Sequence, residues 1–192
     1  QKLTKDLFPG LNFEDQYLVQ NISSDFYHLD GQILEEDYVY GSFLQSKMHA
    51  QGIKCGDCHN VHSNKLKMTG NKLCLQCHVP DTYDSPKHHF HQLNTEASQC
   101  INCHMTGKYY MGNDFRRDHS FRIPRPDQSV KFGTPNACSE CHQDKSEEWA
   151  AEWVVNWYGK ERKPHFSDYL LISNQSKLNP VERKKLDTFI ND

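Results

Sequence analysis

The sequence predicts a mainly α-helical protein with long irregular loops and little or no β-sheet. Only 36% of the 192 residues are hydrophobic and the mean hydropathy is -0.85, so the side chains supply little material for an aliphatic core. Residues 36–143 are interrupted by Gly, Pro, Asn and Asp and show no long alternating strand pattern. Helical signals are clear near the C-terminus. These three observations define the expected fold class.

The N-terminal half is expected to contain little regular structure. Residues 1–35 contain no cysteine and mix apolar and polar side chains without a firm period, so we expect an ordered arm. Short helices are expected over 37–50 and just after each of four cysteine motifs in residues 36–143.

Two helices are predicted in the C-terminal part. Ser146–Tyr158 has acidic residues in its first turn, tryptophans at every fourth position and Gly159 just past its end. We expect the tryptophan stripe to pack on the preceding segment. Asn179 followed by Pro180 reads as an N-cap and a first helical residue, which start a final helix through Ile190. The chain therefore divides into an arm (1–35), a cysteine-rich core (36–143) and a helical segment (144–192) packed on that core.

All eight cysteines fall into four CxxCH motifs, which are Cys55-Gly-Asp-Cys58-His59, Cys74-Leu-Gln-Cys77-His78, Cys100-Ile-Asn-Cys103-His104 and Cys138-Ser-Glu-Cys141-His142. CxxCH is the pattern of c-type haem attachment. Two thiols at this spacing reach the two vinyl groups on one edge of a porphyrin and form thioethers. The following histidine then binds the iron from one side. The sequence predicts four covalent haems, whose apolar macrocycles supply the core that the side chains lack.

Three other interpretations of the cysteines are weaker. A disulfide framework leaves the repeated histidine unexplained. The spacing from Cys55 to Cys77 fits a zinc ribbon, but 34 residues separate Cys103 from Cys138, and a ribbon gives no reason for a histidine after each pair. A thioredoxin-type CxxC would occur once, before a helix in an alternating β/α pattern, and no such pattern is present.

Each iron needs a sixth ligand, and eight histidines remain for this role. His49 precedes the first motif, His62 follows His59 by three residues, and His88, His89 and His91 form a dense cluster. We expect the distal ligands to be His49, His62, His89 and His119, with His88, His91 and His28 as further candidates. Four arginines are suited to neutralising haem propionates, namely Arg116, Arg117, Arg122 and Arg125.

Charge and hydropathy restrict the partners and the location. The net charge is -3, from 22 basic and 25 acidic residues, without a basic stripe, so no nucleic acid is expected. No apolar run approaches the roughly 18 residues of a transmembrane segment. Attachment of c-type haem takes place after export. We therefore expect a mature exported protein in the periplasm, at the cell surface or outside the cell.

Residues 27–159 resemble multihaem c-type cytochromes of the group that includes tetrahaem electron carriers and pentahaem nitrite reductases, in particular bacterial members fused to tetratricopeptide repeats. The segments that carry the resemblance are Asp30-Gly31-Gln32, Tyr38-Val39-Tyr40-Gly41-Ser42-Phe43, His88-His89-Phe90-His91, Arg116-Arg117-Asp118-His119-Ser120-Phe121, Ile123-Pro124-Arg125-Pro126 and Gly133-Thr134-Pro135-Asn136-Ala137-Cys138. The resemblance implies a multihaem cytochrome c fold with mainly bis-histidine haems in a closely stacked chain. Relatives often carry further CxxCH motifs upstream, whereas residues 1–54 contain none.

The expected function is electron transfer through four closely packed haems, with other cytochromes or reductases as redox partners and no catalytic residue. One alternative is a subunit of an extracellular conductive filament or a larger redox complex, in which surplus histidines of one copy serve the haems of the next. The other is an oxidoreductase acting on a small nitrogen or sulfur compound, which would need an open coordination position.

Overall fold

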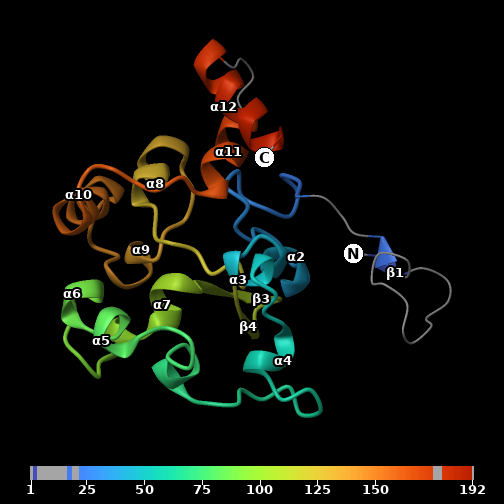
Figure 1. The fold of residues 1–192 in the computed structure, drawn as a ribbon, viewed down its shortest axis with the longest axis vertical. Coiled ribbons are helices and arrows are strands. Elements are labelled where there is room, and N and C mark those ends of the chain that lie inside the picture. Colours follow the sequence, from blue (N-terminus) through green and yellow to red (C-terminus); the bar gives the residue numbers. More distant parts are fainter. Residues whose placement is uncertain (1, 4–16, 19–21, 175–178, 192) are drawn as a thin grey trace.

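A computed structural model describes residues 2–3, 17–18, 22–174 and 179–191. Within them the chain forms short helices joined by long loops, with two small two-stranded sheets (Figure 1). In one sheet β1 (Lys2–Leu3) pairs antiparallel with β2 (Tyr17–Leu18). The expected fold class is confirmed. Residues 1, 4–16 and 19–21 of the expected N-terminal arm lie outside the described residues.

The expected helix over 37–50 is two helices, α2 (Val39–Leu44) and α3 (Lys47–Ala50). The break occurs because Ser46 adopts an extended conformation and its Oγ accepts the backbone N–H of His49 at 3.0 Å. A serine in this position caps the helix that follows it.

Short helices lie on three of the four cysteine motifs, and a short helix follows the second motif as expected. The first, third and fourth motifs contain α4 (Cys55–Cys58), α7 (Cys100–His104) and α9 (Cys138–Cys141). The second motif follows the 3-10 helix η1 (Gly70–Leu73) and precedes α5 (Pro80–Tyr83) and α6 (Pro86–His89). Helices just after the first and third motifs were therefore predicted wrongly. A helical turn places residues three apart on one side, which suits two cysteines that share one ligand.

A β-hairpin follows the third motif and the short 3-10 helix η2 (Glu96–Ser98) that precedes it. Strand β3 (Gly107–Tyr110) pairs antiparallel with β4 (Asp114–Arg117). The turn contains Met111 and Gly112 at φ 48 and 77, a left-handed geometry that suits tight turns. Tyr110 at the end of β3 is buried against Tyr27 and Ile33.

The C-terminal helices are largely those predicted. Helix α10 (Glu147–Tyr158) starts where Ser146 Oγ accepts the N–H of Trp149 at 3.2 Å. Helix α12 (Pro180–Asn191) starts where Asn179 Oδ1 accepts two backbone N–H groups at 3.0 and 2.9 Å. Between them α11 (Phe166–Ser173), which the sequence did not indicate, is capped by His165.

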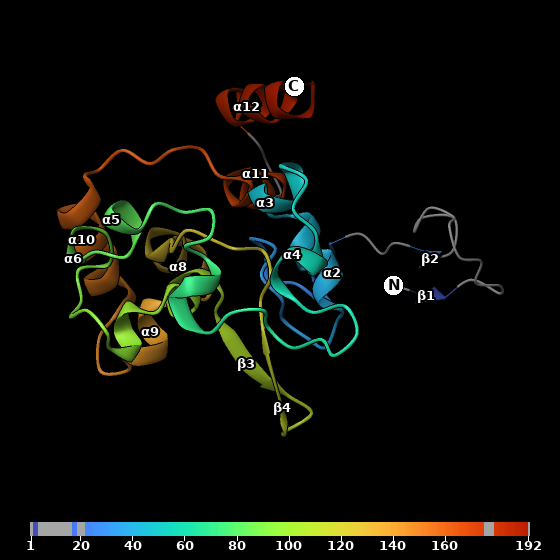
Figure 2. The ribbon, with the colours of Figure 1, turned by 60° about the horizontal axis from the view of Figure 1, so that its bottom comes forward.

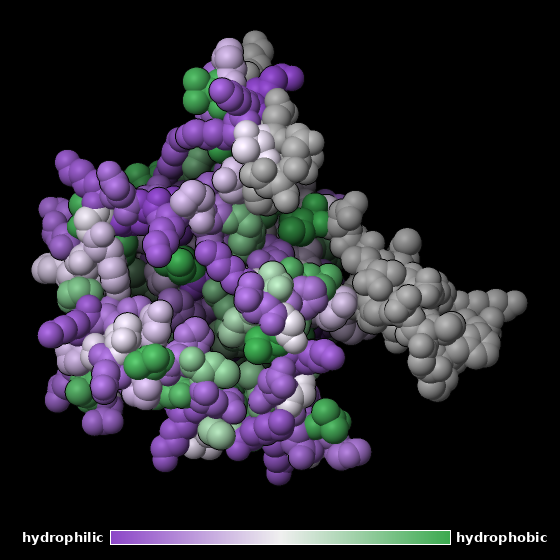
Figure 3. All heavy atoms as spheres, in the orientation of Figure 1, coloured by the Kyte–Doolittle hydropathy of each residue, from purple (hydrophilic) through white to green (hydrophobic). Residues whose placement is uncertain are grey.

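The interior is mostly polar. Among the described residues, eight hydrophobic side chains are buried, against fourteen polar or charged ones. Helix α10 packs against α8 (Pro126–Phe132), and it lies beside α6 in both views (Figures 1 and 2). Figure 3 shows hydrophilic residues over most of one face, with hydrophobic residues in separate patches. The protein part therefore has no continuous apolar core among the described residues, as the composition predicts.

Candidate haem-ligand sites

Three of the four motif histidines face a second histidine. The distances between ring centroids are 6.4 Å for His59 and His119, 6.1 Å for His104 and His88, and 6.3 Å for His142 and His91. The first two pairs are close to parallel, with interplanar angles of 28° and 12°, and the third is tilted by 34°.

These separations fit one iron atom between each pair of rings. A bond from a metal to an imidazole nitrogen is about 2 Å long and that nitrogen lies about 1 Å from its ring centroid, so two imidazoles on opposite sides of one metal have centroids about 6 Å apart. In direct contact, aromatic rings stack with centroids as close as roughly 4.5 Å. The three pairs therefore have the spacing that bis-histidine ligation requires.

The second nitrogen of several of these rings is fixed by a backbone carbonyl. Nδ1 of His59 lies 3.0 Å from the Asn64 carbonyl, Nδ1 of His104 lies 2.6 Å from that of Arg122, and Nδ1 of His119 lies 2.9 Å from that of Arg117. Nδ1 of His91 likewise contacts the carbonyl of His89. A carbonyl only accepts, so Nδ1 carries the proton in each ring and Nε2 keeps its lone pair for a metal.

Burial favours the neutral form of three of the paired rings. Burial lowers the pKa values of His88, His104 and His119 below the ordinary value. Only the neutral imidazole binds a metal. The environment therefore favours the protonation state that an axial ligand needs.

Within the histidine cluster, a residue with left-handed backbone geometry lies between His88 and His91, the two members that face motif histidines. Phe90, at φ 57, ends α6 directly after His89. Its ring stacks on Trp157 of α10 at 4.6 Å and 3°. The reversal directs His88 toward the third motif and His91 toward the fourth. The stacking also anchors α10 to the cysteine-rich core, as expected for the tryptophan stripe.

The thiols of consecutive motifs are close to one another. None of the eight cysteines, all of which are described, forms a disulfide. A hydrogen bond to Cys100 and burial raise the pKa of the Cys74 thiol. Burial, with Cys138 and Cys141 nearby, raises that of Cys103 to about 11. Burial and charged neighbours that include Cys77 raise that of Cys58. The four motifs thus lie next to one another in chain order.

The other candidate histidines do not face a motif histidine. His62 lies on an exposed loop where its N–H binds Asn60 Oδ1 at 3.1 Å. His49 contacts the edge of Phe43 at 5.3 Å, and His28 is half-buried. Nε2 of His89 is buried without a hydrogen-bond partner. His78, in the second motif, contacts Tyr83 at 5.3 Å rather than an imidazole. The roles of His28, His49, His62 and His89 as distal ligands stay predictions.

The four arginines expected near propionates have protein partners. Arg116 binds Glu36 and Asp114, and Arg125 binds Asp127 and Asp168. Arg117 donates to the carbonyls of Ile101 and Met105 at the end of α7.

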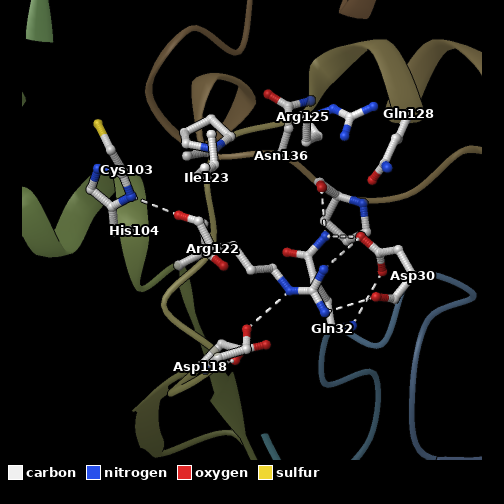
Figure 4. A pocket seen from close by; sticks show the side chains of 15 residues that line it. Asp30, Gln32, Cys103, His104, Asp118, Arg122, Ile123, Arg125, Gln128 and Asn136 are labelled. Atoms are coloured by element: carbon white, nitrogen blue, oxygen red, sulfur yellow. Dashed lines mark hydrogen bonds and ion pairs between the residues drawn. The ribbon is translucent and has the colours of Figure 1, made fainter. Parts of the chain in front are cut away.

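Arg122 lies at the centre of a buried polar network beside the third motif. Figure 4 shows its guanidinium directed toward Asp30. It donates to the Asp30 carbonyl at 2.8 Å and to Ser120 Oγ at 2.9 Å, and it lies 3.5 Å from the Asp30 carboxylate. Asp30 also accepts from the Gln32 side chain at 2.8 Å, and Asp118 accepts from the N–H of Ile33 at 3.2 Å. Sequence spacing gives no signal for this network.

Two further searches of the described residues gave negative results. No group of three or more His, Cys, Asp or Glu side chains is placed to hold a metal ion; the histidines meet in pairs. No helix in these ranges is long and apolar enough to cross a bilayer.

The paired imidazoles beside CxxCH motifs, in a fold of short helices and loops, are the features of a multihaem c-type cytochrome. Residues 48–83, which span the first two motifs, match the family described as doubled CXXCH motif. No curated protein matches the sequence.

The fold is similar to that of a solved structure, the outer cell wall cytochrome OcwA. The similarity has a TM-score of 0.52 at 15% sequence identity, and it covers 79% of this chain and 45% of that one. The chain thus spans less than half the length of the protein it matches. The likeness establishes a multihaem cytochrome fold.

Proposed function

We propose that the chain binds four c-type haems and transfers electrons along them. The observation that carries this function is the set of three imidazole pairs at 6.1–6.4 Å, each containing a motif histidine. An iron with two histidine ligands has no free position for a substrate, so it is suited to electron transfer rather than catalysis.

The motif residues and their facing histidines would hold the haems. The thioether positions are Cys55, Cys58, Cys74, Cys77, Cys100, Cys103, Cys138 and Cys141, and the proximal ligands are His59, His78, His104 and His142. The distal ligands are His119 for the first motif, His88 for the third and His91 for the fourth. The haem supplies the one-electron chemistry. The chain holds the axial rings in the metal-binding tautomer through the carbonyls that face Nδ1.

The route of the electron follows the order of the motifs. Cys100 and burial raise the pKa of the Cys74 thiol, and burial with Cys138 and Cys141 nearby raises that of Cys103, so the thiols of these consecutive motifs lie near one another. Because each cysteine pair bonds to the edge of one porphyrin, adjacent thiols bring adjacent haem edges together.

An exported location and redox protein partners fit this function. The similar structure is that of an outer cell wall cytochrome, and c-type attachment takes place after export. The filament alternative depended on surplus histidines at 88–91. His88 and His91 face His104 and His142 of the same chain, so two of the three clustered histidines give no support to ligation between copies.

A spectroelectrochemical titration tests the proposed function. We expect the Soret and α bands of the exported protein to change reversibly, with four electrons taken up per chain. A control lacking the fourth haem, Cys138→Ala combined with Cys141→Ala, should take up three. A protein without haem bands, or one whose bands do not respond to potential, would contradict electron transfer through haem.

A further inference from the structure

We propose that the iron held by the second motif has no histidine on its distal side and binds a small exogenous ligand there. The inference rests on the proposed haem binding. It adds an open position to a chain whose other three irons are closed, and it therefore gives one site at which small-molecule chemistry could occur.

The first support is the surroundings of His78. All twelve histidines lie within residues 22–174, which the structure describes without gaps. The other three motif histidines face an imidazole at 6.1–6.4 Å, whereas His78 makes its ring contact with Tyr83, at 5.3 Å and 83°. Three of the four motif histidines thus have a histidine placed as a distal ligand, and His78 has none.

The second support is the state of His89, the remaining member of the histidine cluster. Its Nδ1 accepts the backbone N–H of His91 at 3.1 Å. A neutral ring that accepts at Nδ1 carries its proton on Nε2, so Nε2 has no lone pair for a metal. This is the reverse of His59, His104 and His119, whose Nδ1 atoms face carbonyls. His89 is therefore held in the tautomer that does not bind iron through Nε2.

Four other histidines face no motif histidine and are held by other contacts. His165 caps α11, where its Nδ1 lies 2.8 Å from Ser167 Oγ. Asn60 Oδ1 accepts the N–H groups of both His62 and Ser63, which holds His62 in an exposed turn. His49 packs on Phe43 at 5.3 Å. His28 lies within the segment that Asp30 ties to Arg122 through buried contacts. None of these histidines has a ring contact with His78.

The third support is the position of the second motif at the surface. His78 is exposed, whereas His59, His104 and His142 are partly buried. The whole segment 76–83 around it is exposed. Tyr83 also contacts His88, at 5.3 Å and 82°, so one ring joins the second motif to the distal histidine of the third. A ligand bound at the second iron would therefore lie next to the third haem. That haem, with two histidine ligands on its iron, can supply or accept electrons.

Spectroscopy of the oxidised holoprotein tests this site, with cyanide as the probe. We expect one high-spin haem in four by electron paramagnetic resonance, and one equivalent of cyanide per chain should convert it to low-spin. Carbon monoxide should likewise bind the reduced protein once per chain. A protein with four covalent haems that is wholly low-spin and takes up no cyanide would overturn the open position while leaving electron transfer intact.

Matched variants locate the open haem. Cys74→Ala with Cys77→Ala should remove the high-spin signal and the cyanide binding, whereas Cys138→Ala with Cys141→Ala should retain both. His89→Ala should leave the high-spin fraction at one haem in four. A second high-spin haem in His89→Ala, or a signal that survives loss of the second haem, would overturn the assignment. If the cysteine variants fail to mature, the cyanide stoichiometry of the native protein decides the question.

Discussion

The backbone carbonyl of Arg122 accepts a 2.6 Å hydrogen bond from Nδ1 of His104. The same residue reaches with its guanidinium to the Asp30 carbonyl, at 2.8 Å, and lies 4.7 Å from the Phe166 ring. One arginine thus connects a proposed iron ligand to the N-terminal segment and to α11. The orientation of the third proximal histidine therefore depends on residues far from it in sequence.

Replacing Arg122 with alanine should destabilise the protein strongly. The side chain is buried and faces the buried Asp30 carboxylate, and breaking a buried pair by removing one partner costs about 3–5 kcal/mol. Chemical unfolding followed by circular dichroism measures the loss. Arg116→Ala, which removes an exposed pair with Asp114 and Glu36, serves as the control and should change little.

A second substitution separates this charge effect from lost packing. Asp30→Asn added to Arg122→Ala should recover part of the stability, since it removes the unpaired buried charge. If the losses of unfolding free energy in the two single variants simply add in the double variant, the Arg122–Asp30 pair does not stabilise the fold. The electron paramagnetic resonance g-values of the third haem should also shift in Arg122→Ala, because the backbone carbonyl that faces His104 Nδ1 is kept but loses the side-chain contacts that fix its position.

His119→Ala should open the first iron. His119 faces His59 at 6.4 Å and its Nδ1 is fixed by the Arg117 carbonyl, so its loss leaves that iron with one histidine. We expect one additional high-spin haem per chain by electron paramagnetic resonance. His62→Ala is the matched control, because His62 is exposed and faces no motif histidine. Equal spectra for the two variants would count against the pairing.

Protonation of His165 should lower the stability of the protein in acid. Burial, and next the nearby Arg122, lower the pKa of His165 to about 4 from its ordinary 6.5. Because the unfolded chain binds this proton more readily, the stabilisation is complete above pH 6.5 and is lost as the pH falls toward 4. The difference corresponds to on the order of 3 kcal/mol, at about 1.4 kcal/mol per pKa unit.

The matched variant for this effect is His165→Asn. Asparagine still caps a helix but does not titrate, so unfolding free energies measured between pH 4 and 6.5 should vary less than in the parent protein. An equally steep pH dependence in the variant would assign the effect to other groups.

Local chemistry was predictable from the sequence, whereas long-range pairing was not. The caps at Ser146 and Asn179 act on residues two or three positions away, so α10 and α12 appear where the pattern placed them. The four motifs are likewise contiguous in sequence.

The pairing of histidines with motifs was not predictable, because it depends on long-range contacts that the spacing of residues along the sequence does not reveal. His119 reaches His59 across 60 residues because Ser42 Oγ accepts its backbone N–H at 3.0 Å. The left-handed Phe90 separates His88 from His91. Arg122 and Arg125 likewise pair with aspartates of distant segments, Asp30 and Asp168. The hairpin of β3 and β4 is too short to give an alternating signal.

The mass of the intact exported protein under denaturing conditions tests the central claim most directly. Thioether bonds survive denaturation, so the account predicts the mass of the chain plus four haems. Cys100→Ala with Cys103→Ala should lower this by one haem. A native mass equal to that of the bare chain, or one carrying a metal ion without porphyrin, would contradict the account.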